Sequence, residues 1–261
     1  MPKQRHQNYL TELQEQTAAW QRKPGLRAVY RRWYERIVEQ LSPLRPVVEI
    51  GAGCGNFKQY LPESRATDAI RCGPWIEQIV DAQSLPFEPD SIGNYVLIDC
   101  LHHIPHPLQF LSEALRTLKP GGRIVLLEPA VTWGSRPFWA VFHHEPIDLS
   151  ANLLDASRVL PENDGFTYAN MGTACLLFER HLPELKRRFP DLILKTMQYS
   201  DFLAYASTGG FSYYSLLPSP LIRSLLRWEE RLVPQCMWRL IGLRMLIVLE
   251  KSADAVPAEH I

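Results

Sequence analysis

The sequence predicts an α/β fold in which a mainly parallel sheet carries helices on both faces. Between residues 46 and 130, short apolar runs alternate with helical patterns, from VVEI at 47–50 to RIVLLEP at 123–129. The runs are continuously apolar, as is typical of strands that are buried on both sides. A glycine-rich turn follows the first run, which places a ligand loop at the carboxyl ends of the strands.

The other elements follow from periodicity and from breaker residues. Residues 8–41 repeat apolar side chains at three- and four-residue steps, with a break at Pro24-Gly25, and predict helix. Over 130–175 the pattern is lost, and so long a segment is typical of a lid or binding loop. Strands are expected at 47–50, 65–70, 79–82, 94–100, 123–129, 192–200 and 244–251, and helices at 108–118, 174–188 and 221–233.

The composition excludes several classes of protein. The 28 basic and 28 acidic residues cancel, so no overall charge favours a nucleic-acid partner. No run approaches the roughly 18 apolar residues of a membrane span, and the N-terminus lacks the apolar core of a signal peptide. Five scattered cysteines without a CxxC pair indicate free thiols, so we expect a reduced, cytoplasmic protein.

The turn after the first strand has the pattern E-x-G-x-G-x-G, with glycines at 51, 53 and 55. A dinucleotide-binding loop would need its third glycine at position 56, which is Asn. Glu49 lies inside the apolar strand, and its carboxylate suits a positive amino or sulfonium group and repels a pyrophosphate. The spacing and the acid therefore argue against NAD, although a tight turn alone would also explain the glycines.

Four segments in order resemble one family. EIGAGCGNF (49–57) resembles the first motif of the class I S-adenosylmethionine-dependent methyltransferases, in particular the methyltransferase type 11-like group. DAQSLPFEPDS (81–91), YVLIDCLHHIPHP (95–107) and LRTLKPGGRIVLLEP (115–129) are similar to the later motifs. The resemblance is strong over 46–130 and covers only the general layout elsewhere. It implies a Rossmann-like fold with a seven-stranded, mainly parallel sheet, and S-adenosylmethionine as the cofactor.

The resemblance also implies which residues bind the cofactor. Asp68 would hold the ribose hydroxyls, Asp81 would face the adenine amino group with Ala82 beneath the ring, and Asp99 would border the methionine moiety. A plain helix cap for Asp68, a turn for Asp81 and a strand cap for Asp99 stay open as alternatives. The full cofactor-binding set is Glu49, Gly51, Ala52, Gly53, Gly55, Asp68, Asp81, Ala82 and Asp99.

Two histidines follow the fourth strand, where ligands of open α/β sheets bind. His102 follows Leu101 much as the general-base histidine does in the aromatic O-methyltransferases that it resembles, and His103 is expected in the acceptor pocket. His102 lining the pocket, without acting as a base, is the alternative. No metal is expected, because adjacent histidines seldom face one ion and because the second group, His143 to Glu145, lies in a separate segment.

The chain is expected to divide into a helical N-terminal extension (1–45), a methyltransferase domain (46–252) and a tail (253–261). Insertions at about 130–175 and 205–242 would form a cap on the acceptor side. Both are rich in aromatic side chains, which suit an apolar or aromatic acceptor, although each ring would equally serve ordinary packing. The aromatic residues concerned, with two histidines, are Trp133, Phe138, Trp139, Phe142, His143, His144 and those between Phe202 and Tyr214.

Residues 221–233 form an amphipathic pattern with arginines on one side. Through 221–240 the protein is expected either to contact a membrane surface or a partner protein, or to pack on the core. Contact with a membrane surface or a partner protein would suit a lipid-like or carrier-tethered acceptor. The protein would then lie at the inner face of the membrane as a peripheral protein.

The predicted function is S-adenosylmethionine-dependent methyl transfer to a small or lipid-like, hydrophobic or aromatic acceptor, with oxygen favoured. A NAD-dependent oxidoreductase and a catalytically silent binding or scaffold protein are the alternatives. No nucleic acid is expected as the acceptor, because IDCL (98–101) stands where a nucleic-acid methyltransferase carries an NPPY-like tetrapeptide.

Overall fold

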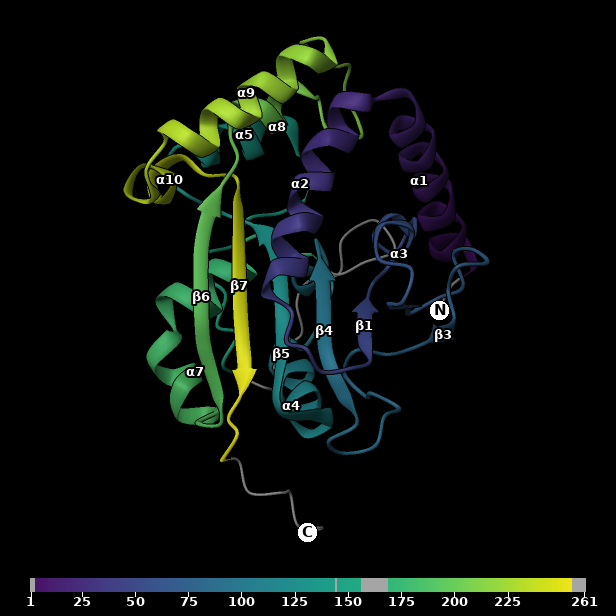
Figure 1. Ribbon diagram of the computed structural model, residues 1–261, viewed down its shortest axis with the longest axis vertical. Coiled ribbons are helices and arrows are strands. Elements are labelled where there is room, and N and C mark those ends of the chain that lie inside the picture. The colour runs from purple at the N-terminus through teal and green to yellow at the C-terminus, as the bar shows by residue number, and fades with distance from the viewer. Residues whose placement is uncertain (1–2, 144, 156–168, 255–261) are drawn as a thin grey trace.

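A seven-stranded sheet in the order β3-β2-β1-β4-β5-β7-β6 forms the centre of the computed structural model, which describes residues 3–143, 145–155 and 169–254 (Figure 1). Only β7 runs against its neighbours, and every other pairing is parallel. The predicted fold class is therefore confirmed. The strands are β1 (Val47–Ile50), β2 (Arg65–Asp68), β3 (Gln78–Ile79), β4 (Ile92–Ile98), β5 (Leu118–Pro129), β6 (Leu192–Ser200) and β7 (Arg244–Lys251).

The central strands form because their apolar runs are buried on both sides. All four residues of β1 and the first six of β4 are buried, as continuous apolar sequence requires. The parallel strands all end at the same edge of the sheet, which is the upper edge in Figure 1. The glycine turn after β1, Asp68 at the end of β2 and Asp99 after β4 therefore lie along one edge.

Twelve helical segments connect and flank the strands within the described residues. The first two are separated at Lys23, and Pro24 opens the second, at the helix position that tolerates proline. The helices are α1 (Lys3–Arg22), α2 (Pro24–Gln40), α3 (Asn56–Tyr60), the 3-10 turn η1 (Leu101–His103), α4 (Pro107–Thr117), α5 (Ser135–Phe142), α6 (Thr173–Cys175), the π-helical η2 (Leu176–Arg180), α7 (Leu182–Arg188), α8 (Leu203–Ser207), α9 (Ser219–Leu232) and α10 (Gln235–Ile241).

Two expectations about elements were wrong. The strand expected at 79–82 is reduced to Gln78–Ile79, and both residues are exposed, so this edge strand has little apolar burial to extend it. The segment 130–175 is not patternless, because α5 and the start of α6 lie in it. Residues 156–168 of that segment fall outside the described part of the chain.

The N-terminal extension is packed into the fold. Helix α2 lies across the sheet (Figure 1), and its inward side chains Trp33 and Ile37 are fully buried. The segment that joins it to β1 is held by Asn94, whose amide accepts the Ser42 N–H at 2.8 Å and donates to the Leu44 carbonyl at 2.8 Å. The division at residue 45 stays a prediction.

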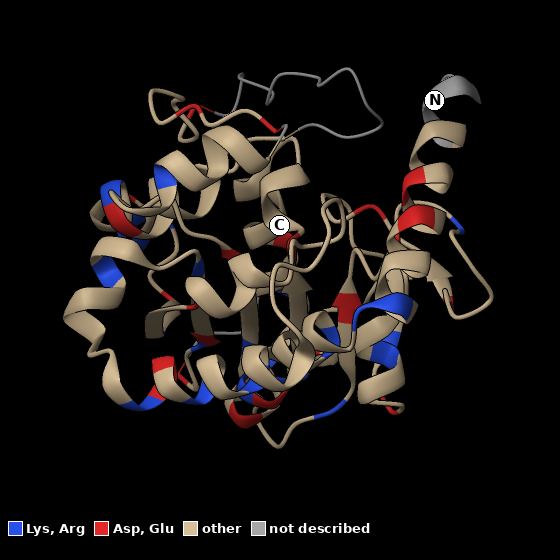
Figure 2. Cartoon of the chain, turned by 90° about the horizontal axis from the view of Figure 1, so that it is seen from above, with Lys and Arg blue, Asp and Glu red and all other residues tan. Residues whose placement is uncertain are grey.

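The described residues show neither a separation of positive from negative charge nor a membrane-spanning helix. Basic and acidic residues alternate along the elements when the chain is seen from above (Figure 2). None of the described helices combines the length and the apolar character needed to cross a membrane.

Candidate functional site

The turn after β1 depends on its glycines. Gly51, Gly53 and Gly55 have φ values of 73°, 46° and 70°, a left-handed conformation that side chains with a Cβ rarely adopt. A Cβ on Gly51 would also lie 2.4 Å from the Cys100 sulfur. The turn therefore brings bare backbone to the edge of the sheet, beside the residues that follow β4.

Asp68 holds this turn from the end of β2. Its Oδ2 accepts the Gly53 N–H at 2.9 Å, and its Oδ1 accepts the Ile70 N–H at 3.3 Å. Burial raises the pKa of the carboxyl group, and these N–H donors oppose the rise. The carboxylate thus lies beside the glycines, as the resemblance implies. The N–H that it accepts from Ile70 belongs to a turn, and not to a helix as the alternative of a plain helix cap would require. Its contact with a ribose stays a prediction.

Glu49 is the most unusual acid of this region. Its side chain is 4% exposed, and within the described part of the chain Oε2 has no hydrogen-bond partner. Burial, and then the charge of Asp68, raise its pKa to about 8, while Lys58 opposes the rise. A buried carboxyl oxygen without a partner is expensive, so this atom marks a place for a donor, best a cationic one.

The predicted adenine side of the site contains a residue, Trp75, that the sequence analysis did not include. Trp75 donates its indole N–H to the Gly53 carbonyl at 2.8 Å, and its ring covers Gly55 and Gly73, where an added Cβ would lie 2.5 Å and 2.4 Å from it. Asp81 lies in an exposed turn, in which its Oδ1 accepts the Gln83 N–H at 2.8 Å.

The structure also places Ala52 and Ala82, two further residues of the predicted cofactor-binding set. Ala52 is buried in a small apolar cluster with Ala66 and Ile76, and Ala82 packs against the main core. Neither position tests the predicted adenine contact.

Helix α1 covers the glycine turn from outside (Figure 1). Leu13 lies 3.5 Å from the position of a Cβ on Gly53, and Thr17 lies 3.5 Å from the Cys54 sulfur. Because Leu13 is buried there, the extension closes one wall of the cofactor side.

Asp99 faces a buried arginine. Asp99 has φ of 51° and forms an ion pair with Arg244 from the start of β7. The Arg244 guanidinium lies over the rings of Trp33, Tyr205 and Trp139 at 4.6, 4.8 and 5.8 Å. Burial raises the pKa of Asp99, and Arg244 opposes the rise. The pair joins the predicted methionine side to an aromatic cluster, which we define as Tyr30, Trp33, Phe138, Trp139 and Tyr205.

The aromatic cluster joins segments that are far apart in sequence. Trp33 of α2 lies 5.2 Å from Tyr205 of α8, and Phe138 of α5 lies 6.4 Å from the same ring. The two predicted insertions therefore meet above the ends of β5 and β7. Trp133, by contrast, is 84% exposed and does not belong to this cluster. His144 lies outside the described residues.

His102 is held by a buried carboxylate at the end of β5. Glu128 accepts the N–H groups of Cys100 and Leu101 at 2.9 and 2.8 Å through Oε1, and its Oε2 lies 2.6 Å from His102 Nδ1. His102 is 3% exposed and Glu128 is fully buried. The carboxylate fixes the ring so that Nε2 faces away from β5.

Glu145 meets both predicted histidines. Its carboxylate oxygens lie 3.3 Å from His102 Nε2 and 3.4 Å from His103 Nε2, and 3.7 Å from His143 Nδ1. The expectation that the two histidine groups stay apart was therefore wrong, because the chain after α5 folds back onto η1. His106 donates its backbone N–H to Gln83 Oε1 at 2.9 Å, and its carbonyl accepts the N–H groups of Gln109 and Phe110 at the start of α4.

The two carboxylates change the titration of His102. Burial by itself lowers the pKa of the imidazole, but the carboxylates of Glu128 and Glu145 outweigh burial and raise the pKa to about 10. Burial raises the pKa of Glu145, yet the three histidines hold it well below its usual range. With Glu145 in contact, the ring is a cation and cannot accept a proton. The role of general base stays a prediction and requires a neutral ring.

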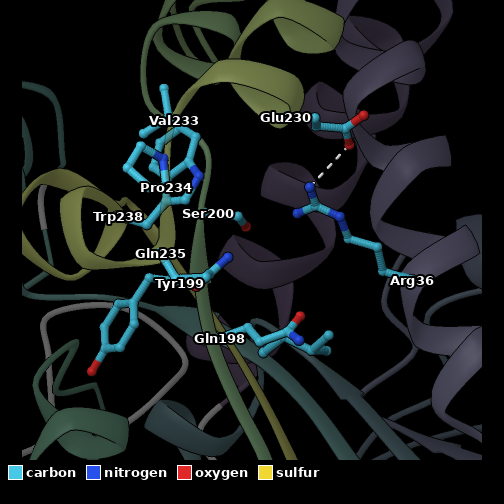
Figure 3. A pocket seen from close by; sticks show the side chains of 10 residues that line it. Arg36, Gln198, Tyr199, Ser200, Glu230, Val233, Pro234, Gln235 and Trp238 are labelled. Carbon is cyan, nitrogen blue, oxygen red and sulfur yellow. Dashed lines mark hydrogen bonds and ion pairs between the residues drawn. The ribbon is translucent and has the colours of Figure 1, made fainter.

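A separate cavity of about 310 Å³ lies between α2, β6 and α10 (Figure 3). Arg36 reaches into it toward Glu230, with 2.9 Å between Nη2 and Oε1, and Gln198 and Trp238 form part of its wall. It shares no residue with the predicted cofactor set.

A family model described as "Methyltransferase domain" matches residues 21–185, which is more than half of the chain. The chain belongs to this family, and it is an S-adenosylmethionine-dependent methyltransferase. The alternative of a NAD-dependent oxidoreductase is therefore wrong.

Two relatives carry the name of a methyltransferase, and one solved structure aligns over most of the chain. A protein of Cereibacter sphaeroides named "Ubiquinone/menaquinone biosynthesis C-methyltransferase UbiE" is 24% identical over 212 residues, which cover 72% of this chain and 76% of the relative. A protein of the same name from Bartonella quintana is 32% identical over 138 residues, which cover 52% and 45%. A solved SAM-dependent methyltransferase from Archaeoglobus fulgidus aligns with a TM-score of 0.49 at 16% identity, covering 85% of this chain and 93% of that one.

The residues of the β1 edge fit the cofactor. S-adenosylmethionine carries a cationic amino group, and the buried, unpartnered Oε2 of Glu49 would accept its N–H. The bare backbone at Gly51 and Gly53 leaves room for close approach. When bound, the cofactor supplies an electrophilic methyl group on a sulfonium. The chain's own task is then to align the acceptor with it and to exclude water.

The first prediction concerns Asp68. We expect the purified protein to bind S-adenosylhomocysteine with micromolar affinity in calorimetric titration and not to bind NADH. Asp68→Asn should weaken binding by about 10- to 100-fold, because hydrogen bonds to a charged acceptor contribute about 1.5–3 kcal/mol. Asp191→Asn, at the opposite edge of the sheet, is the matched control. Equal affinity in the two variants would remove Asp68 from the cofactor site.

The second prediction concerns Glu49 and pH. Its pKa of about 8 means that the free protein holds a proton there at neutral pH, and a cationic ligand must expel it. Affinity for S-adenosylhomocysteine should therefore rise by up to about tenfold per pH unit as pH approaches 8 from below. Calorimetry in buffers of different ionisation enthalpy counts the released proton. Glu49→Gln should bind more weakly with a flat profile, and an unchanged slope in this variant contradicts the assignment.

Proposed function

We propose that the enzyme methylates a hydrophobic, ring-bearing acceptor that carries a hydroxyl group, and that oxygen is favoured over carbon or nitrogen. The observation that supports this most is the meeting of the aromatic cluster with the histidines after β4. The ring of Trp139 lies 5.5 Å from that of His143, and His143 contacts Glu145, which contacts His102. Apolar walls with a few convergent polar groups are typical of sites for small planar ligands.

A hydroxyl acceptor must lose its proton during the transfer, and His102 is the candidate to receive it. Glu128 holds Nδ1, so a neutral ring has its lone pair on Nε2, on the side of Glu145. An acceptor that took the place of Glu145 at Nε2 would lower the pKa of the ring toward its usual value. The dyad of Glu128 and His102 would then serve as an oriented base.

Transfer to carbon is the second candidate, because the relatives are named C-methyltransferases of ubiquinone and menaquinone biosynthesis. A ring carbon beside a deprotonated hydroxyl is itself nucleophilic, so the same acceptor class and the same base would serve. Only the position of the new methyl group separates the two outcomes.

The third prediction tests acceptor and base together. Incubation with ¹³C-methyl-labelled S-adenosylmethionine and a panel of hydrophobic phenols and prenylated hydroquinones should place the label on the acceptor, where NMR distinguishes O-methyl from C-methyl carbon. His102→Ala should lower the rate on the order of 10²-fold with unchanged binding of S-adenosylhomocysteine. His106→Ala on the same loop should retain the rate. Label found only on amine acceptors would overturn the proposal.

We further infer that α9 and α10 contact an anionic membrane surface from which such an acceptor is taken, rather than a carrier protein. Ile222 and Leu226 are buried against the body of the protein, so the outward face of α9 is not the face that packs on the core. That face carries apolar side chains beside arginines, the composition of interfacial helices. The exposed apolar residues are Leu221, Trp228 and Leu232, continued by Met237 and Leu240, and the arginines are Arg223, Arg227 and Arg231.

The fourth prediction is measured by co-sedimentation with vesicles. The double variant Trp228→Glu and Leu232→Glu should lower binding to phosphatidylserine vesicles at least about tenfold, since each apolar side chain contributes about 1.5–3 kcal/mol when buried. Ile193→Glu, an exposed apolar position near the start of β6 and away from the Ser200 end beside α10, should not change it. Wild-type protein that stays in the supernatant would contradict the inference.

A further inference from the structure

Three potential metal ligands converge beside the acceptor side of the site. One donor atom from each of His102, His103 and Glu145 lies within 4.8 Å of the others. All three side chains are at least partly shielded from water, with exposed fractions of 3%, 25% and 12%. They come from η1 and from the chain after α5, so the fold, and not one short motif, assembles them.

The distances suit a bound cation. Zinc bonds to imidazole nitrogen or carboxylate oxygen are about 2.0–2.1 Å long, which makes the edge of a coordination tetrahedron about 3.3–3.4 Å. His102 Nε2 and His103 Nε2 lie 3.3 and 3.4 Å from the Glu145 oxygens. Strong hydrogen bonds between charged partners are shorter, at about 2.7–2.9 Å. Each histidine nitrogen therefore lies about one such edge from an oxygen of Glu145, Oε2 for His102 and Oε1 for His103, and the three donor atoms lie within 4.8 Å of one another.

The surroundings of the three residues resemble those of metal ligands. Glu128 holds His102 Nδ1 at 2.6 Å, as outer carboxylates do for metal-binding histidines, and so directs Nε2 toward Glu145. On the other side, the N–H of Glu145 donates to His143 Nδ1 at 3.3 Å, which fixes the start of its side chain. Both ends of the cluster are thus oriented by groups outside it.

We propose that His102, His103 and Glu145 bind a divalent transition-metal ion of the Zn²⁺ type. Two imidazoles and one carboxylate leave at least one coordination position for an oxygen ligand, as in catalytic zinc sites. Mg²⁺ and Ca²⁺ prefer sets of oxygen ligands, so this donor set selects against them. A bound cation would occupy His102 Nε2, so the role of base proposed for His102 applies to the metal-free protein; in the metal-loaded protein the acceptor hydroxyl would bind the cation, which would lower the pKa of the hydroxyl and let its proton pass to water. This catalytic part rests on the proposed function, whereas the binding itself does not.

The fifth prediction is a zinc titration of metal-free protein against a chromogenic chelator, in a Cys236→Ala background that removes the exposed thiol. We expect one ion per chain. His103→Ala and Glu145→Gln should each weaken binding at least about tenfold, and Glu128→Gln should weaken it about 10- to 100-fold. His106→Ala, which removes a neighbouring imidazole from the same loop, should leave the affinity unchanged.

Two further measurements keep the result unambiguous. The Co²⁺ spectrum should show tetrahedral nitrogen and oxygen coordination without thiolate charge-transfer bands. Thermal unfolding and S-adenosylhomocysteine binding of each metal-free variant show that it is folded and that the cofactor site is intact, independently of any acceptor. The proposal is overturned if wild-type protein binds zinc no more tightly than Glu145→Gln, if His106→Ala loses as much affinity, or if Mg²⁺ binds equally well.

Discussion

One buried carboxylate, that of Glu128, joins the two central strands of the site. Glu128 is the last but one residue of β5. Its carboxylate accepts two backbone N–H groups of the turn after β4 and holds the ring of His102. Those N–H groups would otherwise be buried without partners, which is costly. Because Asp99, His102 and His103 all lie on this turn, the placement of the residues predicted for the methionine side and for the acceptor side depends on a contact between neighbouring strands.

The N-terminal extension serves both halves of the site. Its first helix lies over the glycine turn through Leu13, and its second supplies Trp33 to the aromatic cluster. The ion pair of Asp99 and Arg244 adjoins Trp33, with the guanidinium buried among aromatic rings and the Asp99 side chain 29% exposed. We therefore expect the extension to form part of the wall of both the predicted cofactor site and the proposed acceptor site, even though it precedes every motif.

Sequence reasoning found what local pattern encodes and missed what long-range packing adds. The continuous apolar runs gave β1, β6 and β7 at their observed bounds, and the glycine spacing located the turn with its positive φ values. Arg244 and Glu128 both belong to strands that the sequence predicts. The apolar pattern of a strand does not show, however, that the side chain of either residue contacts the turn after β4. Glu145 was noticed but set apart, because 42 residues separate it from His103. Only the folding of the intervening chain brings these groups together.

The ring of Trp75 has a consequence for how this sequence can diverge. Gly55 has a positive φ, so its backbone alone restricts it to glycine, whereas Gly73 does not, and only the indole occupies the space of its side chain. Positions 73 and 75 should therefore covary among relatives: where the tryptophan is kept the glycine should be kept, and where a small residue replaces the tryptophan, position 73 is free to change. Gly73 would then be retained because of the neighbouring indole, and not because of a contact with the cofactor.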